Sequence, residues 1–458
     1  MSQNTRLLRP RAIAIGVGVS VVLAITMGTL AAQRGTGASL STAGTWVTAW
    51  ATSQQALGEV TISNATVRMI ARVTIAGDAI RIRLDNGYGT EPLHIGRASV
   101  GHRIQGAAVA VGSQRTVTFD GRPDVAVPPG GSVWSDPIAL PVQAQQDLAV
   151  SLFVSGANTR PSQHTGAAVT SYRTADGSGD ATAVEGREPF TGTVTSTWWL
   201  KAIDVRAVGA ARTIVAFGDS ITDGTCSTLD AHDRWVDVLA VRLALSSAGA
   251  GASGGPRLAV VNEGIGGNTV TRDGLRPPPD SLPGVERLDR DVLSHHGVSD
   301  VIVFMGTNDL RRDASVEQIK TGLTSIIRRT REAQKSLRVI GVTMIPRHNV
   351  AASGTNTGWS DEKTGRRNEL NRWIKTAAGF DAVLDFDKVV AQTAQPDLLQ
   401  PAFNCGDGIH PSPAGYFAMG RAIDLTIFNR PLRSTVRVTP DAGTAPPSGS
   451  TTDRPAAR

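Results

Sequence analysis

Most of the sequence has almost no surplus of positive over negative charge, although the formal net charge at pH 7 is +6. Only six of the 46 basic residues are lysine, and the ends carry most of the surplus, with +3 in residues 1–11 and +2 in residues 431–458. The 419 residues between the ends are almost neutral. A protein that tracks phosphates needs a local basic face, so we expect no nucleic-acid partner.

Cysteine and aromatic residues are also scarce. Two cysteines without neighbouring cysteine or histidine ligands are too few for a structural zinc site. Aromatic residues make up 5% of the chain, and Trp198-Trp199 is the only adjacent aromatic pair in residues 46–207, so no aromatic stripe marks a sugar-binding face there. Hydrophobic residues still make up 40%, which is enough to build a folded core.

One long apolar run is present, at residues 12–32, directly after three arginines (Arg6, Arg9 and Arg11). As a helix it is long enough to cross the hydrocarbon of a bilayer, and the basic flank orients the N-terminus inward. Residues 1–33 are therefore predicted to be a membrane anchor or a cleaved signal, two alternatives that the pattern leaves open. Either way we expect a secreted or cell-surface protein, with residues 34–45 as a linker of small residues.

Residues 46–207 show the two-residue period of half-buried β-strands. Apolar residues alternate with more polar ones through residues 67–75 and 80–84, and Gly77-Asp78 between them predicts a hairpin. Similar runs follow, separated by glycine, proline and aspartate, at residues 115–119, 124–127, 137–142 and 147–154. The pattern predicts an antiparallel β-sandwich accessory domain of about jelly-roll size.

Residues 211–430 show continuous apolar runs instead, at 213–217, 258–262, 301–305, 338–345 and 382–386. Helices are expected between them, one begun by a capping box of Ser315 and Gln318 and the last by Ser412-Pro413. Apolar strands that alternate with helices predict a parallel sheet covered on both faces, and hence an α/β domain. The tail, residues 431–458, is rich in proline, serine, threonine and glycine and is expected to be disordered.

Polar residues follow the strands of this α/β domain. Strand ends lead into Gly218-Asp219-Ser220, into residues 262–269, into residues 306–309 and, through a loop, into residues 407–410. Because ligands bind at the carboxyl ends of such strands, we expect these segments to meet in one pocket. A hydroxyl, an imidazole with a carboxylate, and several amide donors are the set that acyl transfer by a serine nucleophile needs.

The roles follow from the residue types. Ser220 is the expected nucleophile, His410 the general base and then acid, and Asp407 the carboxylate that orients the imidazole. The oxyanion is expected to receive hydrogen bonds from the Ser220 and Gly267 backbone N–H groups and from the Asn308 side chain. Gly266, the neighbour of Gly267, is the alternative backbone donor in that loop. Asp219 and Asp309 are expected to make loop hydrogen bonds. Packing or surface roles are expected for the histidines His164, His295, His296 and His348.

In these four blocks the sequence resembles the GDSL/SGNH hydrolase superfamily. The matching residues are GDS at 218–220, Gly267 within IGGN, GTND at 306–309 and DGIH at 407–410, with GDSIT in place of GDSL in the first block. The resemblance covers residues 211–430, about half of the chain, and extends to a β-rich region before the catalytic part. It implies a flavodoxin-like three-layer fold and ester hydrolysis with no metal or nucleotide cofactor.

Cys226 lies six residues after Ser220, and Cys405 lies two residues before Asp407. The expected fold therefore brings both cysteines to the edge of the sheet that carries the active site. A disulfide needs Cα atoms within about 7 Å, and we expect one here, pinning the His410 loop to the Ser220 loop. It would also fit an exported protein, although two free buried thiols are the alternative.

These observations predict an extracytoplasmic serine esterase that works through an acyl-enzyme. An acyl-carbohydrate or a short-chain lipid ester is the expected substrate, and the oligomeric state is left open. An acyltransferase with the same covalent step remains an alternative, as does a surface binding protein that has lost catalysis. The β-rich domain is expected to serve as a spacer or to shape the cleft rather than to bind glycan by itself.

Overall fold

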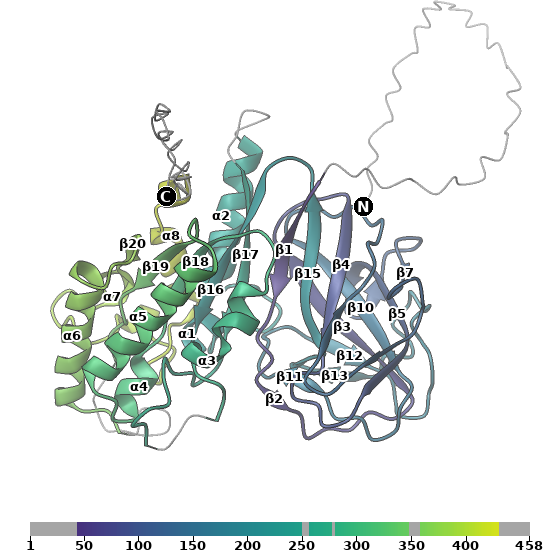
Figure 1. The fold of residues 1–458 in the computed structure, drawn as a ribbon, viewed down its shortest axis with the longest axis horizontal. Coiled ribbons are helices and arrows are strands. Elements are labelled where there is room, and N and C mark those ends of the chain that lie inside the picture. The colour runs from purple at the N-terminus through teal and green to yellow at the C-terminus, as the bar shows by residue number, and fades with distance from the viewer. Residues whose placement is uncertain (1–43, 250–255, 277–279, 348–357, 430–458) are drawn as a thin grey trace, which may run out of the picture. The chain divides into compact units, whose positions relative to one another are not determined.

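The structure is a computed structural model that describes residues 44–249, 256–276, 280–347 and 358–429, all within one compact unit (Figure 1). The predicted anchor or signal segment (residues 1–33), nearly all of the linker and the 431–458 tail lie outside the described residues. Across the ranges that are described, no helix combines the length and the apolar character needed to cross a membrane.

Residues 44–207 are rich in antiparallel β-strands. The longer ones are β1 (Thr45–Ala51), β3 (Ala65–Val73), β4 (Ala79–Asp85), β5 (Leu93–Gln105), β10 (Gln146–Val154) and β15 (Leu200–Ala207). The shorter ones are β2 (Ala56–Leu57), β6 (Ala108–Val109), β7 (Arg115–Val117), β8 (Val125–Val127), β9 (Ser132–Trp134), β11 (Ser162–His164), β12 (Ser171–Arg173), β13 (Gly192–Val194) and β14 (Thr197–Trp198). They form three sheets, in the orders β1-β15-β4-β9, β13-β12-β3-β10-β5-β6 (with β7 and β8 on β5) and β14-β11-β2.

The apolar positions of the alternating pattern are buried in β3 and β4, but the predicted strand pairing is wrong, and in β3 the opposite face is buried too. Val67, Met69, Ile80 and Ile82 are fully buried in one hydrophobic cluster. The hairpin predicted around Gly77-Asp78 is wrong, because β3 pairs with β10 and β12 while β4 pairs with β15 and β9. The two strands belong to different sheets and meet through their side chains. The run at 137–142 forms isolated bridges rather than a strand.

The α/β region is built on a five-stranded sheet, and all of its neighbouring strands are parallel, as predicted. Its strands are β16 (Ala211–Gly218), β17 (Arg257–Gly264), β18 (Val298–Phe304), β19 (Arg338–Val342) and β20 (Ala382–Leu384), in the order β17-β16-β18-β19-β20. Its helices are α1 (Ser220–Asp223), α2 (Trp235–Gly249), α3 (Gly284–Leu288), α4 (Thr307–Arg311), α5 (Val316–Ala333), α6 (Asp361–Thr376), α7 (Phe386–Val390) and α8 (Pro413–Ala422).

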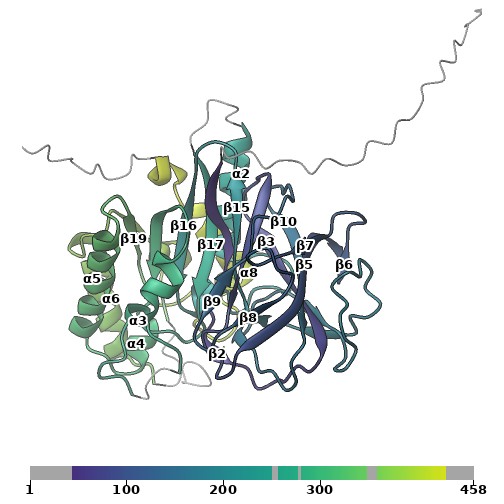
Figure 2. The same cartoon turned by 45° about the vertical axis from the view of Figure 1, so that its right-hand side comes forward.

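Successive residues of this sheet belong to two separate hydrophobic clusters. Val215 and Phe217 of β16 pack in a cluster with residues of α5 and α6, which lie side by side in both views (Figure 1, Figure 2). Ile214 and Ala216 pack in another cluster with residues of α2, α7 and α8. Side chains of a strand point alternately to opposite faces, so each face of the sheet is covered by its own helices. Among the helix starts, Ser315 with Gln318 forms the predicted capping box of α5.

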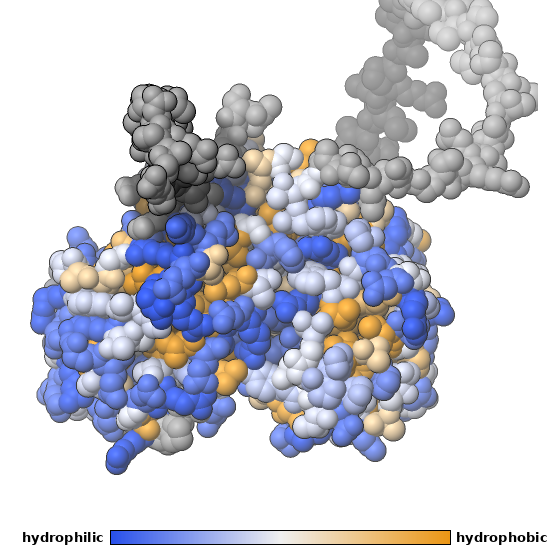
Figure 3. Space-filling model, viewed as in Figure 1, coloured by the Kyte–Doolittle hydropathy of each residue, from blue (hydrophilic) through white to orange (hydrophobic). Residues whose placement is uncertain are grey.

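On the face of the molecule seen in Figure 3, hydrophilic side chains predominate and hydrophobic ones form separate patches. Within the described residues, the large hydrophobic side chains that are exposed come from different elements, for example Ile104 of β5, Leu245 of α2 and Phe417 of α8. Scattered exposure of this kind is normal for a folded protein.

Candidate active site

The strand β16 ends in a tight turn that presents Ser220. Gly218 allows this turn, because a Cβ at its position would collide with the Thr222 side chain and the Phe304 carbonyl oxygen. The Asp219 carboxylate caps α1 by accepting a hydrogen bond from the Ile221 N–H at 3.0 Å, which is the loop role expected for it. Ser220 is therefore the first residue of α1, at the N-terminal end of that helix.

Three side chains from distant segments are joined by hydrogen bonds. The Ser220 Oγ lies 2.8 Å from His410 Nε2, and His410 Nδ1 lies 2.5 Å from Asp407 Oδ2. The other oxygen of Asp407 accepts hydrogen bonds from the Ile409 and His410 N–H groups, each at 2.8 Å. Burial raises the pKa of Asp407, but the hydrogen bonds from His410 outweigh it and lower the pKa to about 2. The carboxylate is thus ionised at neutral pH and held against the ring.

The predicted oxyanion donors lie on segments that are tied to each other. Asn308, in α4, donates from Nδ2 to the Asn268 carbonyl oxygen at 3.0 Å. Asp309 accepts a hydrogen bond from the Val270 N–H at 2.9 Å, which is the loop role expected for it. The segment 306–309 therefore holds the loop that contains Gly267. Gly267 in that loop has φ +72°, a conformation that favours glycine.

The predicted disulfide between Cys226 and Cys405 is confirmed, with the two Cα atoms 6.3 Å apart. It links the segment after α1 to the segment before Asp407, and the Cys405 N–H donates to the His410 carbonyl oxygen at 3.0 Å. Among the residues that the structure describes, the two sulfurs and the Asp407 carboxylate form one grouping of possible metal ligands. The sulfurs are bonded to each other and offer no thiolate to a metal.

A fully buried arginine behind the site was not expected from the sequence. Arg287, in α3, donates from Nη2 to the Gly218 carbonyl oxygen at 2.8 Å and from Nε to Asn268 Oδ1 at 3.0 Å. Its Nη1 donates to Ser53 Oγ, in the β-rich region, at 2.9 Å. One guanidinium therefore connects the turn before Ser220, the loop of Gly267 and the β-rich region.

The charge of Arg287 belongs to a buried network. Asp291 accepts from Arg287 at 3.2 Å and from Lys201 Nζ, on β15, at 2.7 Å. Lys201 also donates to Glu263 at 3.1 Å, and Glu263 in turn lies 2.6 Å from His295 Nε2. All of these side chains are fully buried. Each cation has a carboxylate partner, which is the condition under which buried charges are tolerated.

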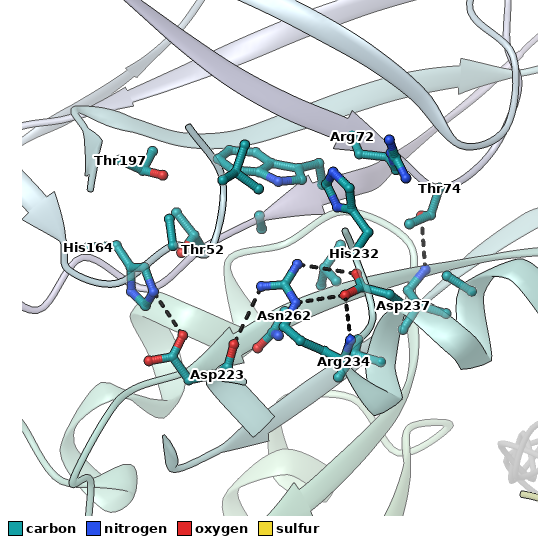
Figure 4. A pocket seen from close by; sticks show the side chains of 18 of the residues that line it. Thr52, Arg72, Thr74, His164, Thr197, Asp223, His232, Arg234, Asp237 and Asn262 are labelled. Atoms are coloured by element: carbon teal, nitrogen blue, oxygen red, sulfur yellow. Dashed lines mark hydrogen bonds and ion pairs between the residues drawn. The ribbon is translucent and has the colours of Figure 1, made fainter. Parts of the chain in front are cut away.

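His164, on β11, also reaches the nucleophile's helix. Its Nε2 lies 3.0 Å from Asp223 Oδ1, at the end of α1 (Figure 4). Its Nδ1 lies 2.8 Å from the Ser53 carbonyl oxygen. Burial lowers the pKa of His164, but the interactions with Asp223 outweigh burial, so the pKa is raised overall. No signal in the sequence distinguishes His164 from His296, which pairs with Asp204, and His348 lies outside the described residues.

A family model matches the segment that contains the four sequence blocks. Residues 216–418 match the model of the GDSL-like lipase/acylhydrolase family, and no curated protein matches the chain. Similar solved structures include a carbohydrate acetylesterase from Sinorhizobium meliloti (21% identity, TM-score 0.35), covering 46% of this chain and 95% of its own. The aryl esterase of M. smegmatis is also 21% identical, with a TM-score of 0.35 and coverages of 46% and 96%. A lipase/acylhydrolase from Enterococcus faecalis is 25% identical, with a TM-score of 0.34 and coverages of 49% and 100%.

The family model covers the segment that carries Ser220, Gly267, Asn308, Asp407 and His410. The superfamily resemblance stated from the motifs is therefore confirmed, with the match to the GDSL-like lipase/acylhydrolase family model at residues 216–418.

Proposed function

We propose that this protein hydrolyses carboxylic esters through an acyl-enzyme formed on Ser220. The observation that carries the proposal is the chain of two hydrogen bonds, from Ser220 Oγ to His410 Nε2 at 2.8 Å and from His410 Nδ1 to Asp407 at 2.5 Å. A hydroxyl is a weak nucleophile until a neighbouring base takes its proton, and this geometry supplies the base and its orienting carboxylate.

In the first half of the reaction, Ser220 Oγ attacks the ester carbonyl carbon while His410 Nε2 takes the hydroxyl proton. Asp407 accepts the Nδ1–H and stabilises the imidazolium. The tetrahedral intermediate then expels the alcohol, to which His410 returns the proton. In the second half, His410 takes a proton from water, the hydroxide attacks the acyl carbon, and Ser220 leaves with that proton as the acid is released.

The negative oxygen of each tetrahedral intermediate needs donors that are already in place. The amide of Asn308 has two hydrogens, and the bond to the Asn268 carbonyl oxygen uses one of them. That bond orients the side chain and leaves the second hydrogen for the oxyanion, beside the Ser220 and Gly267 N–H groups. Loss of one such donor typically lowers kcat by about 10²–10³-fold.

We also infer the finer architecture and the location. The strand order of the parallel sheet supports a flavodoxin-like three-layer catalytic domain at 211–430. The shared core of β3, β4, β5 and β10 supports a β-sandwich accessory domain at 46–207. The disulfide supports an exported protein, because such bonds persist in oxidising compartments.

Labelling with a fluorophosphonate, read by intact mass, tests the nucleophile. We expect one adduct on the wild-type protein and none on Ser220→Ala. Ser246→Ala, a change on the exposed surface of α2, is the matched control and should keep the adduct. A wild-type protein that forms no adduct, or an S220A variant that still forms one, would overturn the proposal. p-Nitrophenyl esters of increasing chain length then separate short-acyl from lipid-type substrates.

A further inference from the structure

A pocket of about 420 Å³ lies between the two regions of the compact unit. Thr165 and Thr195 line it from the β-rich region, and Asp223, Thr225, Ser227 and Gly266 line it from the α/β region. None of these residues takes part in the hydrogen-bonded chain of Ser220, His410 and Asp407. The pocket therefore needs a separate explanation.

The pocket adjoins the segments that carry the proposed catalytic groups. The Thr225 N–H donates to the Ser220 carbonyl oxygen at 2.9 Å, so the pocket begins one helical turn from the nucleophile. Gly266 is the neighbour of Gly267 in the chain. Cys226, also in the lining, is bonded to Cys405 on the segment that leads to His410. Residues of the lining therefore adjoin, along the chain or through a bond, the segments that carry Ser220, Gly267 and His410.

One carboxylate oxygen in the pocket is unused. Asp223 Oδ1 is bonded to His164, whereas Oδ2 accepts no hydrogen bond from any described residue. Oδ2 lies 3.8 Å from the position that a Cβ on Gly266 would take, and Gly266 lines the pocket. The carboxylate therefore has an acceptor on the side of Gly266.

The partners of His164 decide the charge of this carboxylate site. Figure 4 shows the contact of His164 with Asp223. The two ring nitrogens lie beside Asp223 Oδ1 and the Ser53 carbonyl oxygen, and both contacts are hydrogen bonds to an ionised Asp223 when both nitrogens donate. The ring is then an imidazolium that offsets the charge of Asp223. The pair presents an acceptor with little net charge, which suits a neutral hydroxyl better than a cation.

The rest of the lining points to the same ligand chemistry. Thr165, Thr195 and Thr225 are exposed hydroxyls, and the Ser227 Oγ is buried with no hydrogen-bond partner among the described residues. Leu229 is the large apolar side chain of the lining, and a long acyl chain would need many more. Several hydroxyls and one acceptor match the hydroxyl groups of a polyol.

We propose that this pocket binds the alcohol part of the ester as a polyol, with a substrate hydroxyl donating to Asp223 Oδ2. The proposal rests on the proposed esterase function and narrows its substrate class to esters of sugar-like alcohols. It also assigns half of the subsite to the β-rich region, through Thr165 and Thr195 and through His164, which holds Asp223.

The test compares Thr195→Trp, which fills the pocket from an exposed turn, and Asp223→Asn with the matched control Thr191→Trp. Substrates with the same acyl group but different alcohols, an acetylated methyl glucoside and ethyl acetate, are used on the full chain. We expect the ratio of kcat/KM for the sugar ester over the ethyl ester to fall at least about tenfold in both pocket variants and to stay unchanged in the control. The melting temperature of Asp223→Asn shows whether it folds, and Thr195→Trp carries the test if it does not.

A second measurement separates this proposal from the esterase reaction. Binding of methyl glucoside is followed by saturation-transfer NMR on the Ser220→Ala protein, with and without Thr195→Trp. Loss of the signal in the double variant supports the pocket even where no ester is cleaved. The proposal would be overturned if methyl glucoside did not bind to Ser220→Ala, or if the substrate ratio were unchanged in the pocket variants. It would also be overturned if Thr195→Trp changed the preference for p-nitrophenyl acetate over octanoate, because the pocket would then be the acyl subsite.

Discussion

Residues 211–429 supply the hydroxyl, imidazole and carboxylate of the proposed catalytic triad, whereas residues 44–207 supply Ser53, His164 and Lys201, which contact α/β residues near that triad. The triad residues lie at the start of α1 and on a loop. Ser53, His164 and Lys201 are buried and lie on or beside strands. The proposed reacting groups thus all come from the α/β region, whereas both regions supply side chains that hold the segments around them.

This division implies that the β-rich region is part of the structure of the site. Without Lys201, the buried carboxylates of Glu263 and Asp291 lose a cation with which both of them pair. Without Ser53, Arg287 loses one of the partners that orient it toward Gly218 and Asn268. We therefore expect substitutions in the α/β loops to lower activity more than stability. Substitutions in the buried network should lower stability more than activity.

The largest effect is expected for Asp407→Asn. The amide cannot stabilise the imidazolium of His410 as the carboxylate does, so kcat should fall by about 10⁴-fold. The melting temperature should change little, because Asp407 lies on a partly exposed loop. Asp124→Asn, which alters an exposed acid of the β-rich region, is the control and should leave kcat unchanged. A loss of activity that follows a loss of folded protein would break the comparison.

The next largest effect is expected for Lys201→Met. It leaves two buried carboxylates short of a partner, so the free energy of unfolding should fall by about 3–5 kcal/mol. Lys375→Met, at an exposed lysine 3.4 Å from Asp385, should cost less than about 1 kcal/mol. Urea unfolding measures both. If the two variants were equally stable, the network would not join the two regions as inferred.

A smaller effect is expected for the double variant Cys226→Ser/Cys405→Ser. The disulfide closes a long loop, and its loss should lower the free energy of unfolding by about 2–4 kcal/mol. It also releases the segment of Asp407 and His410 from the turn after α1, so kcat on p-nitrophenyl acetate should fall as well. The disulfide lies within the α/β region, whereas Lys201 connects the β-rich region to the α/β region. Comparing the two variants therefore separates a link within one region from a link between the two. Unchanged kcat at a temperature where the variant is folded would show that the bond only stabilises.

Three of the four motifs of the α/β region could be recognised because they follow a strand directly. Gly218-Asp219-Ser220 and residues 306–309 stand at strand ends, and parallel strands bring their ends to one edge. The disulfide followed from the same reasoning and is confirmed. In the β-rich region, alternation identified the buried side chains of β3 and β4 but led to the wrong pairing, because a turn between two strands looks the same whether or not they share a sheet.

The apolar core positions of β3 and β4, the superfamily resemblance and the residues of the four blocks could all be read from the sequence alone. These features depend on neighbours within a few positions of each other in the chain, which is what periodicity and motifs record. Only the tertiary structure decided that Arg287, Lys201 and His164 lie behind those blocks. Apart from Asp291, which lies four residues after Arg287, the partners named above are 19 to 234 residues away in the chain. The local sequence around a buried charge does not indicate which distant group will pair with it.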